Sequence, residues 1–303
     1  MSLLDKLKQL DYPVPEHSMR AGYMLGGLAG FIFIPLVVSG LVMAYYGYVP
    51  SAAHRTAAEM AETASLSGIR AAHSLAADAF LILIFLHMTR VVLTRSYSGA
   101  RSKNWRSGVV ILVLSALFFY TGTALRVDQA GYEAYSHFEQ FVPVNKVWFR
   151  GFHVIALPLL LMGIIGVHAI LVKINKISPL APGHEEGVGP QSTFFKHMRY
   201  VMAYGLIIIG VIHVATAYYT PPLIAAPIVE GVEWTKPSWP FLFLYPLDTW
   251  ALVAVPVSAV IAMLIIPLFV NSSKKWDFSQ GIFFLLVALW AGLALYGAFI
   301  HYA

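Results

Sequence analysis

The sequence contains no cysteine and few charged residues. Asp, Glu, Lys and Arg together make up 12% of its 303 residues. Without a thiol, the chain has no disulfide, no thiolate ligand for an iron–sulfur cluster or zinc, and no thioether attachment for a haem through its own side chains. The charged fraction is also well below the roughly 25% of a soluble domain, which argues against a water-soluble fold.

Apolar residues dominate instead. Hydrophobic side chains make up 58% of the chain, and the mean hydropathy is +0.70. Several apolar runs exceed the roughly 18 residues that mark a membrane-spanning helix. We therefore expect an all-α multi-pass membrane protein in which a four-helix bundle is followed by three further helices. The seven expected spans are 22–48, 69–93, 107–125, 151–173, 198–219, 249–270 and 278–301.

The distribution of basic residues predicts the orientation of these spans. If the N-terminus is placed inside, fourteen of the 20 Lys and Arg residues fall on inner segments. Basic residues collect on the cytoplasmic side of membrane proteins, so we expect the N-terminus inside and the C-terminus outside. The first span is too long for a signal peptide and is expected to be retained. The long segment 220–248 is rich in proline and aromatic residues and is predicted to form a packed outer lid.

Four histidines lie in matched pairs on two of the expected spans. His73 and His87 are fourteen residues apart, and His153 and His168 are fifteen apart. Each pair falls roughly on one helix face, with about 21 Å between its two levels. The topology places His73 and His153 near the outer side, and His87 and His168 near the inner side. Ionisable groups inside a membrane are costly and usually functional. The pattern predicts two His–His clamps suited to two stacked haems, with four structural histidines as the alternative.

Glycines repeat the same period on the neighbouring spans. Gly26 and Gly40 are fourteen residues apart, as are Gly108 and Gly122. A residue without a Cβ lets a flat macrocycle approach the helix backbone closely, so these four glycines are predicted haem contacts. The alternative is ordinary packing of small residues between membrane helices.

Two arginines stand beside the predicted clamps. Arg70 precedes His73 by three residues, and Arg90 follows His87 by three. Guanidinium groups suit carboxylates, so both arginines are predicted partners of haem propionates. Arg90 also fits a plain positive-inside anchor.

The remaining histidines have no matching partner. His213, in the middle of a span, is expected to be a hydrogen-bonded interior group. His197 and Arg199, at the inner surface, are expected to line a quinone site or to meet lipid headgroups. The others are His17, His54, His137, His184 and His301.

These residues resemble cytochrome b of the quinol–cytochrome c (bc-type) and plastoquinol–plastocyanin oxidoreductases. The strongest part of the resemblance runs from Gly68 to Leu180. It comprises Arg70-x-x-His73, His87-x-x-Arg90, Trp105-x-x-Gly108 through Gly122 to Gln129, the second histidine pair, Pro158 and Ile177-Ser178-Pro179-Leu180. The fifteen-residue step and the seven spans look like the chloroplast–cyanobacterial form fused to a subunit IV-like part. The resemblance implies a dihaem four-helix bundle over 1–180 and a subunit IV-like part over 181–303.

The family implies two haem b groups and quinone as substrate or ligand. It also implies a quinol-oxidising pocket between the end of the third span and segment 220–248, and a quinone-reducing pocket at the inner haem. Lys173 matches a basic position near that inner pocket. The expected partners are a Rieske-type iron–sulfur protein or a c-type or multihaem cytochrome, in a homodimeric complex. The expected location is an energy-transducing membrane, such as the prokaryotic cytoplasmic membrane.

The predicted outer pocket departs from the family pattern. The family's Pro-Glu-Trp-Tyr reads Pro237-Ser238-Trp239-Pro240 here, and a serine cannot serve as a carboxylate base. Leu-Pro-Trp-Gly-Gln reads Leu125-Arg126-Val127-Asp128-Gln129, and an arginine is replaced by Trp148, with Arg150 two residues later. Candidates for a substitute proton acceptor, or else solvated loop groups, are Asp128, Glu133, Glu230 and Glu233.

Three functional hypotheses follow. The first is the dihaem cytochrome subunit of a bc-like respiratory or photosynthetic complex, a membrane subunit of a quinol oxidoreductase rather than an enzyme alone. The second is a membrane module that serves a multihaem cytochrome or a molybdenum enzyme, without bifurcated quinol oxidation. A remote third is a haem-free transporter or assembly protein.

Overall fold

The computed structural model describes most of the chain, in several stretches. These are residues 11–46, 59–60, 62–126, 128–142, 145–178, 180, 191–219, 221, 228–231, 233, 235–248, 250–271 and 276–300. The long helices are α2 (Ala21–Tyr46), α4 (Ala64–Leu93), α5 (Ser102–Ala124), α8 (Leu157–Asn175), α9 (Phe194–Thr216), α10 (Ala251–Ile265) and α11 (Phe278–Phe299). With their short extensions, seven segments are long and apolar enough to cross a membrane. The prediction of an all-α protein with seven spans is confirmed.

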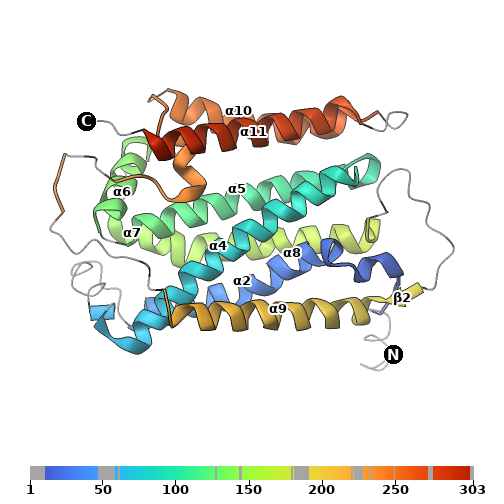
Figure 1. The fold of residues 1–303 in the computed structure, drawn as a ribbon, viewed down its shortest axis with the longest axis horizontal. Helices are drawn as coiled ribbons and strands as arrows, with labels where there is room; N and C mark the ends of the chain where they lie inside the picture. Colours follow the sequence, from blue (N-terminus) through green and yellow to red (C-terminus); the bar gives the residue numbers. More distant parts are fainter. Residues whose placement is uncertain are drawn as a thin grey trace.

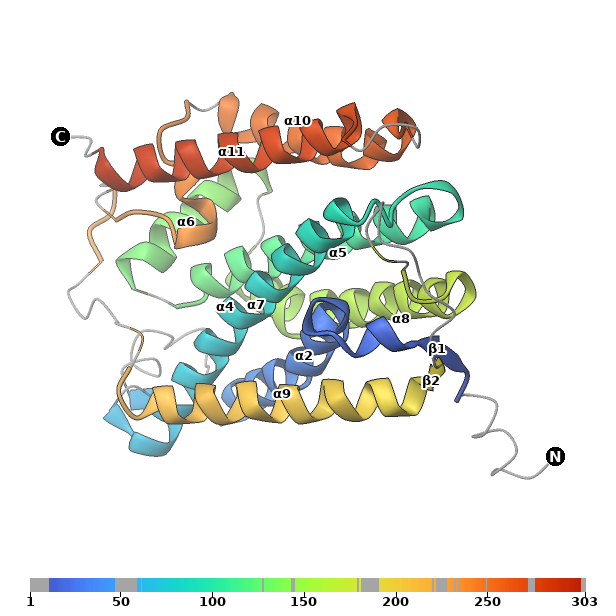
Figure 2. The same ribbon diagram turned by 45° about the vertical axis from the view of Figure 1, so that its right-hand side comes forward.

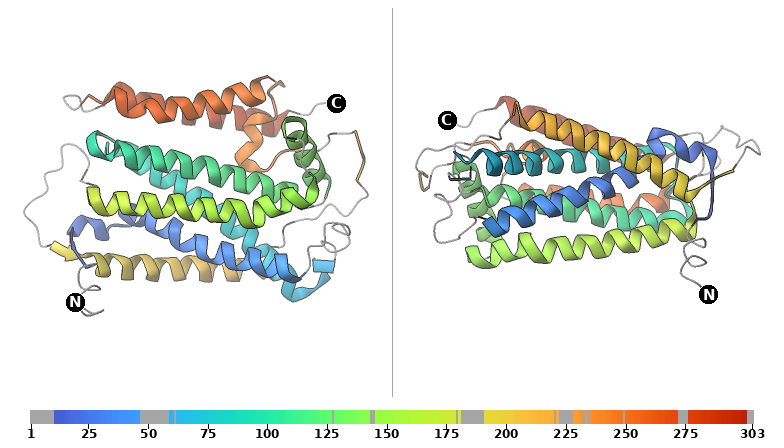
Figure 3. Two further views of the ribbon diagram at one scale, coloured as in Figure 1. Left: turned by 180° about the vertical axis from the view of Figure 1, so that it is seen from behind. Right: turned by 90° about the horizontal axis from the view of Figure 1, so that it is seen from below.

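The long helices lie side by side as a slab of rods. In Figure 1, α4, α5, α8 and α2 occupy the middle, α9 lies on one side of them, and α10 and α11 lie on the other. The turned view in Figure 2 keeps this order, and the view from behind in Figure 3 shows α8 between α5 and α2. The three helices after residue 180 therefore flank the first four on both sides. The division into parts at residue 180 stays a prediction.

Small residues allow α9 to pack closely on α2. A Cβ added at Gly205 of α9 would lie 2.3 Å from the ring of Phe31, and one added at Gly27 of α2 would lie 3.1 Å from Val201. In a membrane, helices associate through such close packing rather than through the hydrophobic effect. The glycines therefore fix the place of α9 against the central helices.

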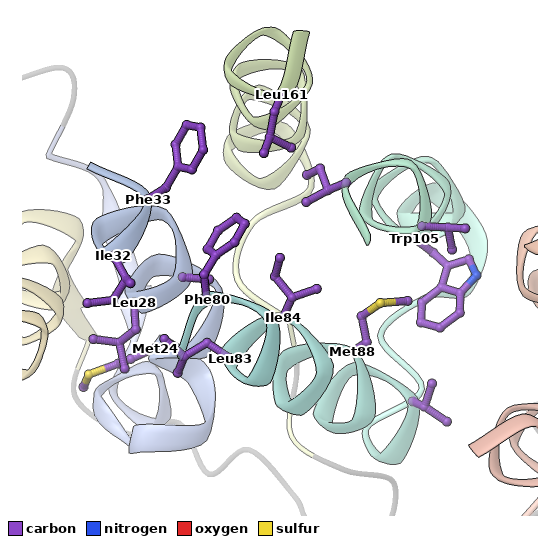
Figure 4. Close-up of a cluster of buried hydrophobic side chains, with 14 of the residues drawn as sticks. Met24, Leu28, Ile32, Phe33, Phe80, Leu83, Ile84, Met88, Trp105 and Leu161 are labelled. Carbon is purple, nitrogen blue, oxygen red and sulfur yellow. The ribbon is translucent and has the colours of Figure 1, made fainter. Parts of the chain in front are cut away.

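An apolar core fills the middle of the four central helices. Figure 4 shows it between α2, α4, α5 and α8. The labelled side chains are Met24, Leu28, Ile32, Phe33, Phe80, Leu83, Ile84, Met88, Trp105 and Leu161. Phe33 and Phe80 stack with their ring centroids 5.5 Å apart. In sequence, Phe80 and Ile84 lie between His73 and His87, so this core separates the two histidine levels.

Shorter elements tie the ends of the helices together. Strands β1 (Pro13–Pro15) and β2 (Gln191–Thr193) pair antiparallel, with Val14 opposite Ser192. They join the segment before α2 to the start of α9. The remaining short elements are η1 (Glu16–Met19), η3 (Gly99–Arg101), α7 (Lys146–Gly151), the π-helical turn η4 (Phe152–Ala156), η5 (Trp239–Leu244) and η6 (Ile266–Phe269).

The end of the molecule that carries His73 and His153, the predicted outer end, holds a helix that the sequence patterns did not reveal. Helix α6 (Gln129–Phe141) begins at Asp128, whose side chain accepts a hydrogen bond from the Gly131 backbone. Its Glu133 accepts hydrogen bonds from the backbone and the hydroxyl of Thr235. Farther along, η5 packs against α11, and Trp290 donates to the Pro240 carbonyl. Thr235 and η5, within segment 220–248, are thus packed against α6 and α11, and the outer lid stays a prediction.

Candidate functional site

The structure brings His87 and His168 face to face. Their ring centroids lie 6.5 Å apart, and the rings are nearly perpendicular, at 82°. Metal–imidazole bonds of about 2.0–2.1 Å would put two ligating nitrogens roughly 4 Å apart, and the ring centroids a little over 6 Å apart. The observed separation therefore fits one metal ion between the two rings. The depth argument from the sequence pairs the same two residues.

His73 and His153 form the second pair, at the opposite end of the bundle. The two imidazoles are close enough to interact electrostatically, and both line a cavity of about 280 Å³. The walls of the cavity are apolar, with Phe33, Phe80 and Phe118 among them. This cavity also reaches the end of α5 and Ser238, which is where the resemblance predicts an outer pocket.

A π-helical turn explains the fifteen-residue step between His153 and His168. Residues Phe152–Ala156 form η4, and the Leu157 N–H donates to the Phe152 carbonyl five residues back. Pro158 has no N–H to donate to Val154, which disfavours an ordinary α-helical turn there. One extra residue in that turn makes the fifteen-residue step equivalent to the fourteen-residue step on α4, so both histidines face the same way.

Hydroxyl groups orient three of the four imidazoles. Nδ1 of His73 lies 2.9 Å from Ser39 Oγ. Nδ1 of His153 lies 2.8 Å from Thr121 Oγ1, and Nδ1 of His168 lies 2.8 Å from Ser107 Oγ.

The same hydroxyls also bond to backbone carbonyls, and this fixes the tautomer of each ring. Ser39 donates to the Pro35 carbonyl at 2.7 Å, Thr121 to Leu117 at 2.9 Å, and Ser107 to Asn104 at 2.9 Å. A hydroxyl has one hydrogen, so its oxygen accepts from the imidazole. Each ring therefore carries its proton on Nδ1, and its Nε2 lone pair is left free for a metal.

His87 is the exception. Its Nδ1 is buried and has no hydrogen-bond partner among the described residues. The three hydroxyl residues each stand directly before a glycine, as Ser39-Gly40, Ser107-Gly108 and Thr121-Gly122. The corresponding pair beside His87 is Leu25-Gly26, in which leucine offers no acceptor.

The four glycines predicted from their period each face one histidine. The distance from an added Cβ to the Cε1 atom of the facing ring would be 2.9 Å for Gly26 and His87, 3.2 Å for Gly40 and His73, 3.7 Å for Gly108 and His168, and 3.0 Å for Gly122 and His153. At Gly26, Gly40 and Gly122 the missing Cβ makes room for the imidazole itself, whereas a Cβ at Gly108 would be at ordinary contact distance. Their predicted contact with a macrocycle stays a prediction.

Arginines gather at the outer cavity. Arg70, Arg126 and Arg150 all line it. Arg70 donates to the Pro221 carbonyl, Arg150 donates to the Ala44 carbonyl at 2.8 Å, and Arg126 pairs with Asp128 at 2.6 Å. Three cations beside an apolar cavity suit the anionic carboxylates of a haem.

At the inner pair, Arg90 is the neighbouring cation. Its guanidinium carbon lies 3.6 Å from the centroid of the Tyr23 ring. Its Nε and Nη2 are buried and have no hydrogen-bond partner among the described residues. These donors are available to an anionic group, as the predicted propionate contact requires.

Other predicted residues lie away from the histidine pairs. Lys173 is exposed in the last turn of α8. His197 is buried and within 3.0 Å of the Ser18 carbonyl, while Arg199 is exposed. His213 is exposed on α9, so the prediction of an interior group is wrong. The helical period alone gave no means of telling the lipid-facing side of α9 from its packed side. His54, His184 and His301 fall outside the described residues.

The four carboxylates considered as substitute proton acceptors have other surroundings. Asp128 and Glu133 are buried and bonded within the outer end of the fold. Glu230 is exposed, and the exposed Glu233 lies 3.2 Å from His137 Nε2.

Sequence reasoning missed the three hydroxyl residues and Asp78. Asp78 lies on α4, and its Oδ1 accepts a hydrogen bond of 2.8 Å from Trp239 Nε1. A lone acidic residue in an apolar run was the available signal for Asp78. The repeated hydroxyl–glycine dipeptide was the signal for the others.

Seven spanning helices with two opposed histidine pairs define a membrane protein of the electron-transport class. The chain belongs to the cytochrome b/b6 family. The family model for cytochrome b/b6/petB matches residues 9–144. Members of this family bind haem b, so the chain is a haem b protein of an electron-transfer system.

Curated relatives include two cytochrome b6 proteins. That of Heliobacterium mobile is 32% identical over 191 residues, which cover 55% of this chain and 90% of the relative. That of Heliobacterium modesticaldum is 29% identical over the same length, with the same coverage. A solved structure described as a hyperthermophilic respiratory Complex III matches with a TM-score of 0.78 at 19% identity. It covers 99% of this chain and 90% of the other, and it supports the fold alone.

Proposed function

We propose that this protein is the dihaem b-type cytochrome subunit of a bc-like complex, and that it carries electrons across the membrane between a quinol pool and a partner redox subunit. The observation that carries the proposal is the two opposed histidine pairs, one at each level of one bundle. Family membership supports haem b, and the pair geometry supports two of them.

The residues present fit a haem at each level. In His73, His153 and His168, whose proton lies on Nδ1, the Nε2 atom remains free to ligate iron. A Cβ at Gly26 would lie 2.9 Å from His87 Cε1, so this position leaves room only for the imidazole ring. Bound there, a haem supplies one-electron redox chemistry. The protein positions its ligands, excludes water from the apolar middle and holds cations for the propionates, through Arg70 at the outer level and Arg90 at the inner level.

Quinone chemistry is proposed at both ends. The outer cavity reaches from His73 and His153 to Ser238, where a quinol could approach the outer haem. At the inner end, Lys173, His197 and Arg199 remain the candidates for a quinone site.

The surrounding assembly is proposed by the same reasoning. Partner subunits of the iron–sulfur or c-type class, a homodimeric complex, and a membrane with the N-terminus inside follow from the family resemblance and from the charge asymmetry. Helix α2 begins at one end of the slab and α11 ends at the other, which agrees with termini on opposite sides.

Ser238 favours a second candidate function. It stands where the family has a glutamate, so the outer site lacks that base. A membrane module that serves a multihaem cytochrome or a molybdenum enzyme would need no such base. The similarity to cytochrome b6 relatives gives no support to a haem-free transporter or assembly protein.

Haem counting tests the main proposal. The purified protein is expected to contain two haem b per chain and to show b-type bands in a reduced-minus-oxidised spectrum. His73→Leu and His87→Leu should each remove one haem, and the double variant should remove both. A single haem, or two haems retained in both single variants, would contradict the proposal. Copurification of an iron–sulfur subunit favours the bc-like version, and copurification of a multihaem cytochrome or molybdenum subunit favours the second.

A further inference from the structure

Asp78 is the only acidic residue within the seven spanning helices that the structure describes. It lies on α4, five residues after His73 and nine before His87. A carboxyl group at this depth costs free energy that the fold has to offset, and such groups usually serve function. The haem sites use histidine, arginine and hydroxyl groups, so they give Asp78 no role.

The single hydrogen bond of Asp78 among the described residues leads to the altered outer stretch. Trp239 Nε1 donates to its Oδ1 at 2.8 Å. Trp239 directly follows Ser238, the residue in the place of the family's glutamate. Ser238 lines the outer cavity, as does Ala77, the neighbour of Asp78 on α4. Asp78 and Trp239 are thus each one position along the chain from a residue that lines the cavity.

Aromatic side chains lie next to Trp239 on the side toward α11. The rings of Trp239 and Trp290 lie 6.4 Å apart, and those of Phe85 and Trp290 lie 6.0 Å apart. Phe85 and Trp239 are partly exposed, at 37% and 39%, on a surface that the membrane would cover. A partly exposed aromatic cluster that ends at a carboxyl group, through the hydrogen bond of Trp239 to Asp78, suits a quinol ring that arrives from the lipid phase.

We propose that Asp78 is the proton acceptor of the outer quinol site and that it takes over the task of the carboxylate missing at position 238. This inference rests on the proposed function. Trp239 positions the carboxyl group through Oδ1, which leaves Oδ2 to face the substrate.

The proton step is balanced as follows. One O–H bond of the quinol breaks, and one O–H bond forms on Asp78, which becomes neutral. The two electrons of the quinol pass to two one-electron acceptors, which would be a b-type haem and the redox centre of a partner subunit. The second proton of the quinol leaves to water at the outer surface.

A purely structural role for Asp78 gives different expectations. In that case the hydrogen bond to Trp239 only fastens η5 to α4, and any side chain that accepts this bond would suffice. Asp78→Asn keeps an acceptor oxygen for Trp239 but cannot take up a proton, so this variant separates the two roles.

The test uses the whole complex, with quinol as the electron donor. Asp78→Asn is expected to lower quinol turnover by about 100-fold or more, while its haem content and its dithionite-reduced spectrum stay as in the wild type. Asp78→Glu should retain most of the turnover. In Asp78→Asn/Ser238→Glu, the carboxylate restored at position 238 should recover at least a tenth of the wild-type rate. Wild-type turnover in Asp78→Asn would overturn the proposal.

A readout independent of turnover is the protonation of the carboxyl group itself. Infrared difference spectra recorded on adding quinol should show a protonated-carboxyl band that Asp78→Asn lacks and that Asp78→Glu shifts. If Asp78→Asn fails to assemble, Trp239→Phe decides the matter. It keeps the carboxylate, so it should assemble and keep at least a tenth of the wild-type turnover, whereas failure of Trp239→Phe to assemble would favour the fastening role and overturn the proposal. A wild-type protein with no haem, or with no reduction by quinol, would instead overturn the proposed function.

Discussion

Gly26 on α2 faces the imidazole of His87 on α4 so closely that a Cβ added at Gly26 would lie 2.9 Å from the Cε1 atom of the ring. No side chain fits there unless the ring moves. The Nδ1 atom of the ring has no hydrogen-bond partner in the described structure.

Gly26→Ala should therefore displace His87 and weaken the inner haem. Overpacking of this kind costs about 1–3 kcal/mol, and we expect partial loss of the inner haem in the purified protein. The matched control is Gly108→Ala on the opposite side of the same site. Its Cβ would lie 3.7 Å from His168 Cε1, which is ordinary contact distance. Haem content measured by a pyridine haemochrome assay should fall in the first variant and stay near two per chain in the second.

The histidine pairs could be predicted from the sequence because the spacing of the histidines and their depth in the membrane both follow from positions along the chain. His73, His87, His153 and His168 stand on long apolar runs, and the glycine spacing repeats theirs. The repeated spacing places one glycine at the level of each histidine, and the structure shows each glycine beside one imidazole ring.

Other features depend on contacts between distant segments, and a single sequence does not reveal them. The bond between Asp78 and Trp239 joins residues 161 positions apart. Helix α6 is short and only partly apolar, so it gave no spanning signal. The exposed side of α9, on which His213 lies, could not be told from its packed side, because nearly every residue around His213 is apolar. The π-helical turn at His153 was hidden because fifteen residues also approximate four turns.

Pro158 is expected to hold that π-helical turn open. Pro158→Ala restores an N–H that can reach the Val154 carbonyl, and this favours an ordinary α-helical turn over 152–156. Closing the turn would rotate His153 by about 100° relative to His168. We expect a lower content of the outer haem and an unchanged inner haem. Redox titration of the two haems, with Pro256→Ala in α10 as the control, measures the effect. Two unperturbed haems in Pro158→Ala would show that other contacts define the turn.

Asp277 links stability to pH at the predicted inner surface. Its side chain caps α11, and its Oδ2 lies 3.6 Å from Arg95 Nη1. Burial alone would raise the pKa of Asp277. Hydrogen bonds from Ser279 and from the Asn271 and Gln280 backbones, together with the Arg95 charge, outweigh burial and hold the pKa below its usual range.

A carboxyl group with a lowered folded-state pKa stabilises the fold above the unfolded-state pKa of about 3.9, and it loses that contribution as the pH falls through the lower, folded-state value. Asp277→Asn should therefore lower the unfolding temperature at pH 7, and the gap to the wild type should narrow as the pH falls below 4. Thermal unfolding in detergent measures both. Glu230→Gln, at an exposed position, serves as the control and should change neither. A gap that widens on acidification would contradict the assignment.

The hydroxyl groups predict unequal haem potentials and hence a direction for electron transfer. Both outer imidazoles donate from Nδ1 to a hydroxyl, through Ser39 and Thr121, whereas Ser107 serves only one of the two inner imidazoles. Donation from Nδ1 makes a histidine a stronger donor to its metal and favours the ferric state. The outer haem should therefore have the lower potential, and electrons should pass from the outer level to the inner level.

Leu25→Ser tests this reasoning, because it places a hydroxyl before Gly26 as at the other three sites. Such a hydrogen bond is worth about 1 kcal/mol, which is roughly 40 mV for a one-electron couple. The inner potential should fall by about that amount in Leu25→Ser and rise by about that amount in Ser107→Ala. Ser39→Ala should raise only the outer potential. Potentiometric titration of the b-type bands measures all three variants. An inner potential that stays the same or rises in Leu25→Ser would show that the missing hydroxyl beside His87 does not set the difference between the two haems.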